Sequence, residues 1–134
     1  MKALRNGICK EFYGFGVYKL SRQLAKEVFE ASKKFPKEEM YSLTDQVRRS
    51  SRSVGAQLAE AWAERSSEKH FVSKLIPIAI GTDGDQLETQ HWIETALDCS
   101  YCSSELAGGL LHQYTLVGKM LNSMIGKSEQ FCKP

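Results

Sequence analysis

Residues 41–62 read YSLTDQVRRSSRSVGAQLAEAW, and this stretch decides the fold because it combines a regular apolar stripe with a dense group of arginines. Its apolar and small residues recur at intervals of three and four, the spacing of a helix that is buried along one side. This face holds Leu43, Val47, Ser50, Val54, Leu58 and Ala61. Arg48, Arg49 and Arg52 fall on the other side. The stretch therefore predicts a helix with one face in a core and the other offering cations to a partner.

The start of this helix carries two competing signals. Ser42 followed three residues later by Asp45 resembles a capping box, because a serine hydroxyl can accept from an early backbone N–H and an acid suits the positive helix end. Pro36 also fits the first turn of a helix. The helix therefore begins at Pro36 or at Ser42, and the sequence leaves both starts open.

An upstream segment has the same periodicity. Its apolar residues again step by three and four, which predicts a first amphipathic helix. They are Val17, Leu20, Leu24, Val28, Ala31 and Phe35. The helix should end at Phe35, because the residue before a proline is pushed away from helical geometry. Residues 1–14 contain glycines that interrupt a helix, so we expect a poorly ordered lead-in there.

A third helix is expected after the serines at residues 66–67, either of which can serve as its cap. Its middle, residues 76–85, reads IPIAIGTDGD. Pro77 removes a backbone donor there, and Gly81 and Gly84 each cost about 1 kcal/mol relative to alanine. We therefore predict that the helix is bent or interrupted within this segment. The inward positions would be Phe71, Leu75, Ile78, Leu87, Ile93 and Leu97.

A fourth helix should follow a short connection at residues 101–104 and end at Gly126. Its heptad-like seam would hold Leu106, Leu110, Gln113, Val117, Met120 and Met124. Four amphipathic helices joined by short links predict an all-α protein, an up-down-up-down antiparallel four-helix bundle. We assign residues 15–127 to this bundle and residues 128–134 to a C-terminal tail.

Charge is distributed unevenly along the 134 residues. Residues 1–70 hold 14 Lys and Arg against 9 Asp and Glu, whereas residues 71–134 hold 4 against 7. The first half is therefore the better face for an acidic partner, and the two halves can attract each other. No apolar run reaches membrane-spanning length, and the N-terminus lacks the apolar core of a signal peptide. We expect a cytoplasmic protein.

Cysteines and histidines give only weak metal signals. Of the four cysteines only Cys99 and Cys102 are closely spaced, and a zinc site would need a second such pair. Glu88 and His91 form half of the Glu-x-x-His pattern that binds metals in ferritin-like bundles, and His112 would lie level with His91 across the last turn. Because the Glu-x-x-His pattern occurs only once, we expect no metal and no cofactor. In a reducing cytoplasm we expect the cysteines to be free thiols.

Several blocks together resemble a known family. They are FPKEEMYSLTDQVRRSSRSVGAQLAEAW, EKHFVSKL, LETQHWIETALDCSY and VGKMLNSMIGKSEQFC, within residues 12–132. They are similar to the bacterial large-subunit ribosomal RNA intervening-sequence proteins, a family that includes the accessory variability determinant of diversity-generating retroelements. The resemblance implies a four-helix bundle that forms homopentamers. It also implies RNA or a reverse-transcriptase-like enzyme as a partner, because the retroelement relatives are basic and associate with both.

The chain departs from the family pattern in two informative places. The usual Asn-Ile-Ala-Glu-Gly is replaced by Gln57-Leu58-Ala59-Glu60-Ala61. The IPIAIG stretch reads as an insertion of about four residues, close to one helical turn. An insertion of that size nearly preserves the facing of the helix that follows.

The arginines of residues 41–62 are the main indication of function. No Ser/His/Asp or Cys/His motif accompanies the three histidines, so we do not expect an enzyme. One hypothesis is a non-catalytic oligomeric adaptor whose Arg48, Arg49 and Arg52, extended by Lys33, Lys34 and Lys37, bind phosphates of RNA. The alternative is a purely structural, self-associating bundle whose arginines are solvated or paired with Asp45, Glu60 or a neighbouring subunit. The two tryptophans suit apolar packing better than base stacking.

Overall fold

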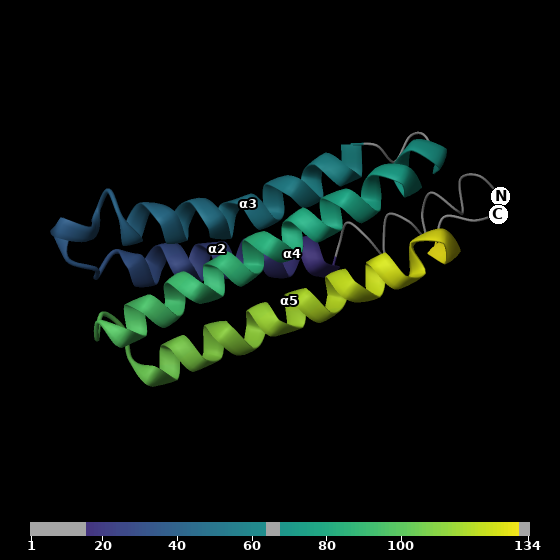
Figure 1. Ribbon diagram of the computed structural model, residues 1–134. Coiled ribbons are helices and arrows are strands. Elements are labelled where there is room, and N and C mark those ends of the chain that lie inside the picture. Colours follow the sequence, from purple (N-terminus) through teal and green to yellow (C-terminus); the bar gives the residue numbers. More distant parts are fainter. Residues whose placement is uncertain (1–15, 64–67, 132–134) are drawn as a thin grey trace.

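The computed structural model describes residues 16–63 and 68–131, which form four long helices and one short 3-10 segment. The helices are α2 (Gly16–Ser32), α3 (Leu43–Ala63), α4 (Glu68–Asp98) and α5 (Ser104–Phe131), and the 3-10 segment is η2 (Lys37–Glu39). Consecutive helices pack side by side in opposite directions, and α5 also contacts α2 (Figure 1). The predicted all-α, up-down-up-down antiparallel bundle is confirmed. Within these ranges, no helix is long and apolar enough to cross a membrane.

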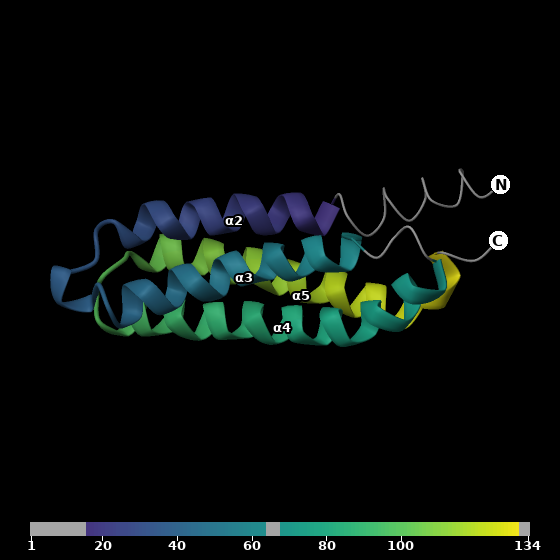
Figure 2. The ribbon, with the colours of Figure 1, turned by 90° about the horizontal axis from the view of Figure 1, so that it is seen from above.

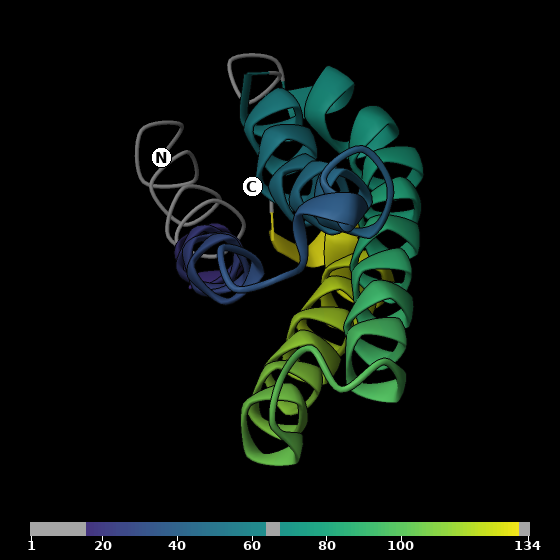
Figure 3. The ribbon, with the colours of Figure 1, turned by 90° about the vertical axis from the view of Figure 1, so that its left-hand side faces the viewer.

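The packing of the four helices is asymmetric. Figure 2 and the end view in Figure 3 show α3 flanked by α2 and α4, while α2 lies away from α4. α5 lies near the start of α2 and diverges from it toward the end of the bundle that carries η2 (Figures 1 and 3). α2 is therefore held mainly by α3, and the joint between these two helices is open to solvent along its outer side.

The predicted apolar stripe of α3 is confirmed. All six residues of the stripe are at most 4% exposed, from Leu43 to Ala61, and Thr44 and Ser51, which the prediction omitted, are buried as well. The apolar residues from Val47 to Ala61 pack with Leu24 and Val28 of α2 and with residues of α4 and α5 in one continuous core. Burying a valine or leucine side chain contributes about 1.5–3 kcal/mol, so this face is a major source of stability.

α4 is continuous, so of the two predicted alternatives within residues 76–85 the interruption is wrong, while a bend there stays a prediction. Pro77 is exposed, and the turns around it are held by packing of Leu75 and Ala79 in the core. Figure 2 shows the first turns of α4 inclined to the rest of the helix. Tertiary packing therefore overrides the weak helical propensity of this segment.

The inward face of α4 also differs from the prediction. Leu75 and Ile93 are buried as expected, but Leu87 is 55% exposed, and the prediction for it is wrong. Phe71 lies outside the described side chains. Polar residues occupy the middle of the buried face, because each can form a hydrogen bond there. The buried positions are Leu75, Ala79, Thr82, Gln86, Thr89, Ile93 and Ala96.

α5 follows the predicted seam only in part. Leu110, Val117 and Met124 are buried, whereas Leu106 is 40% exposed, contrary to the prediction. Tyr114, which the prediction omitted, is completely buried. The helix also continues to Phe131, so the predicted end at Gly126 is wrong. No glycine in the described ranges has a positive φ, so Gly126 stays helical and does not stop α5.

The helix ends near η2 are set by local hydrogen bonds. α2 ends at Ser32, three residues earlier than predicted, because the following turn uses i→i+3 bonds such as Phe35 N–H to the Ser32 carbonyl at 3.1 Å. η2 follows Pro36, and α3 begins at Leu43, which confirms the later of the two predicted starts. The residues of the predicted lead-in and the caps at 66–67 lie outside the described ranges.

Glu39 performs the capping role that the sequence assigned to Ser42. The Leu43 N–H donates to Glu39 Oε1 at 3.4 Å, and the Ser42 hydroxyl donates to the same oxygen at 2.5 Å. The predicted capping box is therefore wrong. Tyr101, in the α4–α5 connection, donates its hydroxyl to Glu39 Oε2 at 2.9 Å and packs its ring against Phe35 at 5.7 Å between centroids. One carboxylate thus caps α3 and joins the two connections at this end of the bundle.

These hydrogen bonds lower the pKa of Glu39, with Ser42 as the main cause and Tyr101 as the second. Because the folded-state pKa lies below the unfolded value of about 4.5, the bonds stabilise the protein above that pH. The contribution is lost as the pH falls through the folded-state pKa. The same hydrogen bond raises the pKa of Tyr101 to about 12.

We predict that Glu39→Gln lowers the urea midpoint of unfolding at neutral pH and flattens its decline at acid pH. The glutamine cannot carry the charge that stabilises the α3 N-terminus and accepts from Tyr101. Glu38→Gln is the matched control, because Glu38 is exposed and forms no hydrogen bond within the described ranges. Identical midpoints and acid profiles for the two variants would contradict the role given to Glu39.

Candidate nucleic-acid interface

Three cations gather around one aromatic ring between α2 and α3. Lys33 Nζ lies 4.8 Å from the centroid of the Phe29 ring, and the guanidinium carbons of Arg48 and Arg52 lie 4.7 and 5.4 Å from it. Arg48 Nε also donates to the Ser32 hydroxyl at 2.7 Å. A cation over a ring contributes about 0.5–1 kcal/mol at an exposed site. We call Phe29, Lys33, Arg48 and Arg52 the Phe29 cluster.

The charges of the Phe29 cluster are only partly balanced. Lys33 pairs with Glu30 at 3.2 Å, but both side chains are more than half exposed, so the pair contributes little. Arg48 and Arg52 have no carboxylate within ion-pairing distance among the residues that the structure describes. Two guanidinium groups one helical turn apart thus retain their full charge beside each other, which is the arrangement that attracts an anion.

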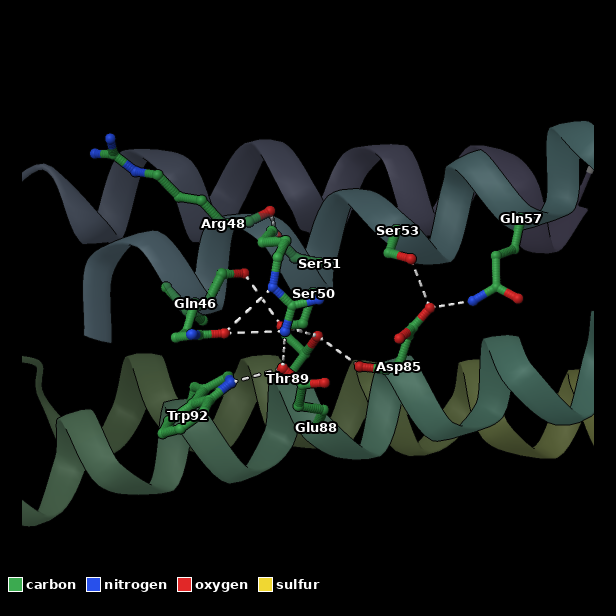
Figure 4. Close-up of polar contacts among 12 residues, drawn as sticks. Gln46, Arg48, Ser50, Ser51, Ser53, Gln57, Asp85, Glu88, Thr89 and Trp92 are labelled. Atoms are coloured by element: carbon green, nitrogen blue, oxygen red, sulfur yellow. Dashed lines mark hydrogen bonds and ion pairs between the residues drawn. The ribbon is translucent and has the colours of Figure 1, made fainter. Parts of the chain in front are cut away.

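Arg49, which the sequence analysis grouped with these arginines, lies on another side of α3. Its guanidinium donates to Gln46 Oε1 at 2.9 Å and forms an ion pair with Glu88 of α4 at 2.5 Å. Trp92 Nε1 donates to the same Glu88 oxygen at 3.0 Å, so this tryptophan packs against the core and is anchored by its ring nitrogen. Figure 4 shows Arg48 directed away from α4, toward α2. The predicted arginine stripe is therefore divided between two sides of α3.

The remaining predicted lysines do not join the cluster. Lys34 lines a second groove, between α2 and α5, together with Lys26, Glu27 and Glu30. Lys37 is exposed on η2. Neither contacts Phe29, so only Lys33, Arg48 and Arg52 of the six predicted phosphate ligands are brought together.

A groove of about 260 Å³ runs along the joint between α2 and α3 and shares Arg52 with the Phe29 cluster. Arg22 lines it from α2, where its guanidinium lies beside the Tyr18 ring, 5.8 Å from the centroid. The lining is otherwise small: Ser21, Ala25, Ser51, Gly55, Ala56 and Ala59. Sequence analysis missed Arg22 because it is isolated along the chain. The available signal was its place on the same helical face as Tyr18 and Ala25.

A ladder of polar contacts fixes α3 against α4 (Figure 4). Ser53 donates its hydroxyl to Asp85 Oδ2 at 2.6 Å, and Gln57 Nε2 donates to the same oxygen. One turn further along α4, the buried hydroxyls of Thr89 and Ser50 are hydrogen-bonded to each other at 2.9 Å. Such contacts specify one register between the helices, because a shift would leave buried polar groups unpaired. The ladder therefore sets which arginines of α3 face α2 and which faces α4.

Two helical glycines lie close to glutamine side chains of a neighbouring helix. A Cβ at Gly81 would lie 2.7 Å from Gln57 Oε1, and one at Gly118 would lie 2.8 Å from Gln86 Nε2. Gly81 ends the stretch that we interpret as an insertion, and Gln57 stands where the family pattern has an asparagine. The absent Cβ at Gly81 thus leaves room for the longer side chain of Gln57.

The weak metal signals do not converge in the structure. Glu88 is engaged by Arg49 and Trp92, and the His91 ring packs on its neighbour Trp92 at 4.7 Å between centroids. His112 is exposed on α5. Within the described ranges, no three His, Cys, Asp or Glu residues are grouped to hold an ion. The predicted half motif is therefore used for packing and ion pairing.

The described cysteines are both free thiols. Cys99 is exposed, and Cys102 is half-buried beside the core, where burial raises the pKa of its thiol. The other two cysteines of the sequence lie outside the described ranges. A thiol with a raised pKa carries less thiolate and is less reactive, which suits a packing role for Cys102.

Comparison with known proteins gives a family match and matches to solved structures. Residues 15–123 match a family model described as 23S rRNA-intervening sequence protein. A solved structure of a protein of unknown function from the S23 ribosomal protein family of Bacteroides thetaiotaomicron is similar at 26% identity. The similarity covers 82% of this chain and 95% of that one, with a TM-score of 0.67. No curated protein matches the chain.

We predict that Asp85→Ala destabilises the fold by about 1–3 kcal/mol, because it leaves Ser53 and Gln57 without their shared acceptor. Urea unfolding measures this change. Glu94→Ala on the same helix is the control, since Glu94 is exposed and should change stability by no more than about 0.5 kcal/mol. An equal, small effect of both substitutions would mean that the ladder does not hold α3 and α4 in register.

Proposed function

The chain belongs to the 23S rRNA-intervening sequence protein family, and on that premise we propose that it is a non-catalytic bundle that binds RNA through the Phe29 cluster. The observation that carries this proposal is the pair of guanidinium groups of Arg48 and Arg52, which face α2 together without a carboxylate partner in the described ranges. Such groups bind phosphate well, because it can accept two parallel N–H donors from one arginine.

The geometry of Arg48 supports phosphate binding in particular. Its Nε donates to the Ser32 hydroxyl, and its guanidinium carbon lies over the Phe29 ring. These two contacts fix the direction of the guanidinium. The two terminal nitrogens have no hydrogen-bond acceptor among the described residues. A side chain that is already held in place loses less conformational entropy when it binds, so the contact is preorganised.

The proposed binding is not sequence-specific. Arginines and lysines on an open helical face reach phosphates, whereas reading a base needs donors and acceptors placed against base edges. The cluster offers cations and one partly buried ring, and no amide side chain lies in it. Affinity should therefore come from charge and fall steeply with salt.

We predict that replacing Lys33, Arg48 and Arg52 together by glutamine weakens binding of a labelled oligouridylate and lowers its salt dependence. Each phosphate contact contributes about −0.7 to the slope of log affinity against log salt for a single strand, so the slope should flatten by about 2. Fluorescence anisotropy at several salt concentrations measures both effects, and circular dichroism checks the fold.

Arg49→Gln is the matched control for this experiment. It removes one positive charge from the same helix as Arg48 and Arg52, but Arg49 is already paired with Glu88 and should not contribute to binding. A loss of binding free energy in Arg49→Gln equal to one third of that in the triple variant would argue for a general charge effect. Salt-insensitive binding by the unmodified protein would refute the proposal, leaving the structural bundle as the better account.

The outer face of α4 supports a second part of the proposal, self-association. Ile76, Ile80 and Leu87 are 37%, 59% and 55% exposed and lie on one face of the helix, four and seven residues apart. The half of the chain that holds α4 and α5 is net acidic and the other half is net basic, so two copies can meet with opposite charge. We propose a homo-oligomer, with the pentamer implied by the family resemblance as the expected size. Repeating the Phe29 cluster around an oligomer would increase avidity for one long RNA.

We predict that the double variant Ile80→Glu, Leu87→Glu lowers the mass measured by light scattering at micromolar concentration. Burying a charged side chain in the middle of an apolar contact costs a large amount of free energy, so the contact between subunits should be lost. The control is His112→Glu, which adds charge at an exposed position of α5 away from this face. A monomeric mass for the unmodified protein would exclude self-association at that concentration.

A further inference from the structure

We infer that the groove between α2 and α3 is the path of a single RNA strand, and that Arg22 supplies a second phosphate contact beside the Phe29 cluster. This inference rests on the proposed RNA binding and adds the path of the strand, the kind of RNA and one further residue. The groove and the cluster are continuous, because Arg52 lines the one and belongs to the other.

Cations lie at both ends of the path that joins the groove to the Phe29 cluster. Arg22 precedes Phe29, the ring of the cluster, by seven residues, which is two helical turns or about 10.5 Å along the axis of α2. Arg52 lines the groove and also lies over the Phe29 ring. A flexible strand that follows the groove would therefore meet Arg22 first and then Arg52 and the rest of the cluster.

The acidic residues of α2 are segregated from this groove. Glu27 and Glu30 line the groove between α2 and α5, on another side of the helix. Arg22 forms no ion pair with a carboxylate in the described ranges, and its contacts are the ring and the hydroxyl of Tyr18. The exposed acids of α3, Asp45 and Glu60, are not among the residues that line the groove. Arg22 and Arg52 are thus the charged residues among those that line the groove, and none of the lining residues is acidic.

The shape of the groove favours a single strand over a duplex. It lies between two helices that pack closely, since a Cβ at Gly55 would be 3.5 Å from Ser21 Oγ. Its alanine and serine lining leaves space for a narrow chain, whereas a duplex is far wider than the distance of about 8–10 Å between packed helix axes. A single strand can place its backbone in the groove and turn bases outward or onto the Tyr18 ring.

The lining disfavours the alternative occupant, an amphipathic helix of a protein. Such a helix would place apolar side chains on the groove and bury Arg22 and Arg52 without partners, which costs free energy. A sugar-phosphate backbone instead presents an anion to each guanidinium.

The test compares three single variants with single-stranded and duplex RNA as ligands. Arg22→Gln should weaken binding of a labelled oligouridylate about tenfold, the loss expected for one charge-assisted contact, and reduce the salt slope by about 0.7. Ala56→Leu should weaken binding by filling the groove without changing charge. Lys34→Gln removes one charge from the groove between α2 and α5 and should bind like the unmodified protein. Duplex RNA of the same length should bind more weakly than the single strand.

Separate outcomes distinguish this inference from the proposed function. If Arg22→Gln and Ala56→Leu bind normally while the triple variant of the Phe29 cluster does not, RNA is bound but not along this groove. Equal affinity for duplex and single strand overturns the inference in the same way. Photocrosslinking with 4-thiouridine oligomers gives an independent readout, with crosslinks expected at Tyr18 and on the facing part of α3. Crosslinks confined to α4 or α5 would refute the path.

Discussion

The position of α3 between α2 and α4 is the constraint on which the rest of the structure depends. Its apolar stripe fills the core, while Gly55 lets α2 approach on one side and Ser53 and Gln57 bond to Asp85 of α4 on the other. Each side of the helix has a different chemistry, so α3 cannot rotate without losing one set of contacts. The directions of its arginines follow from that fixed rotation.

The interior of the bundle is more polar than its apolar stripes suggest, and its hydrogen bonds explain why this is tolerated. Thr82 and Thr89 donate to backbone carbonyls one turn earlier in α4, and Gln86 donates to Asp83. Within the described ranges, the Tyr114 hydroxyl is the buried side-chain atom without a partner, and burial raises its pKa. A buried hydroxyl left unpaired costs about 1–3 kcal/mol, which the surrounding apolar packing of α5 must offset.

The charges of the first half are sorted by the fold into two classes. Arg49 is neutralised by Glu88 and joins α3 to α4, while Arg48 and Arg52 lie over Phe29 and keep their charge available. A neutralised arginine and one that keeps its charge can therefore be neighbours in the chain. This sorting motivates the proposed RNA binding through α2 and α3, and the exposed apolar residues of α4 motivate the proposed self-association.

The sequence by itself determined the helical class, the bundle topology and the apolar stripe of α3, because a strongly periodic apolar pattern permits only one amphipathic helix. The prediction from sequence was wrong where helical propensity or hydrophobicity was considered without the packing of neighbouring helices. α4 remains continuous past Pro77 because packing holds it, and polar Gln86 and Thr89 replace Leu87 in the interior because partners satisfy them.

The types of residue in the candidate site were predictable from the sequence, but the particular residues that form it were not. The sequence identified Lys33, Arg48 and Arg52, yet it could not exclude Arg49 or include Arg22, since both depend on which helix lies opposite. Only the tertiary structure decided this, because a charge is free or neutralised according to what another segment of the chain places within a few ångströms of it.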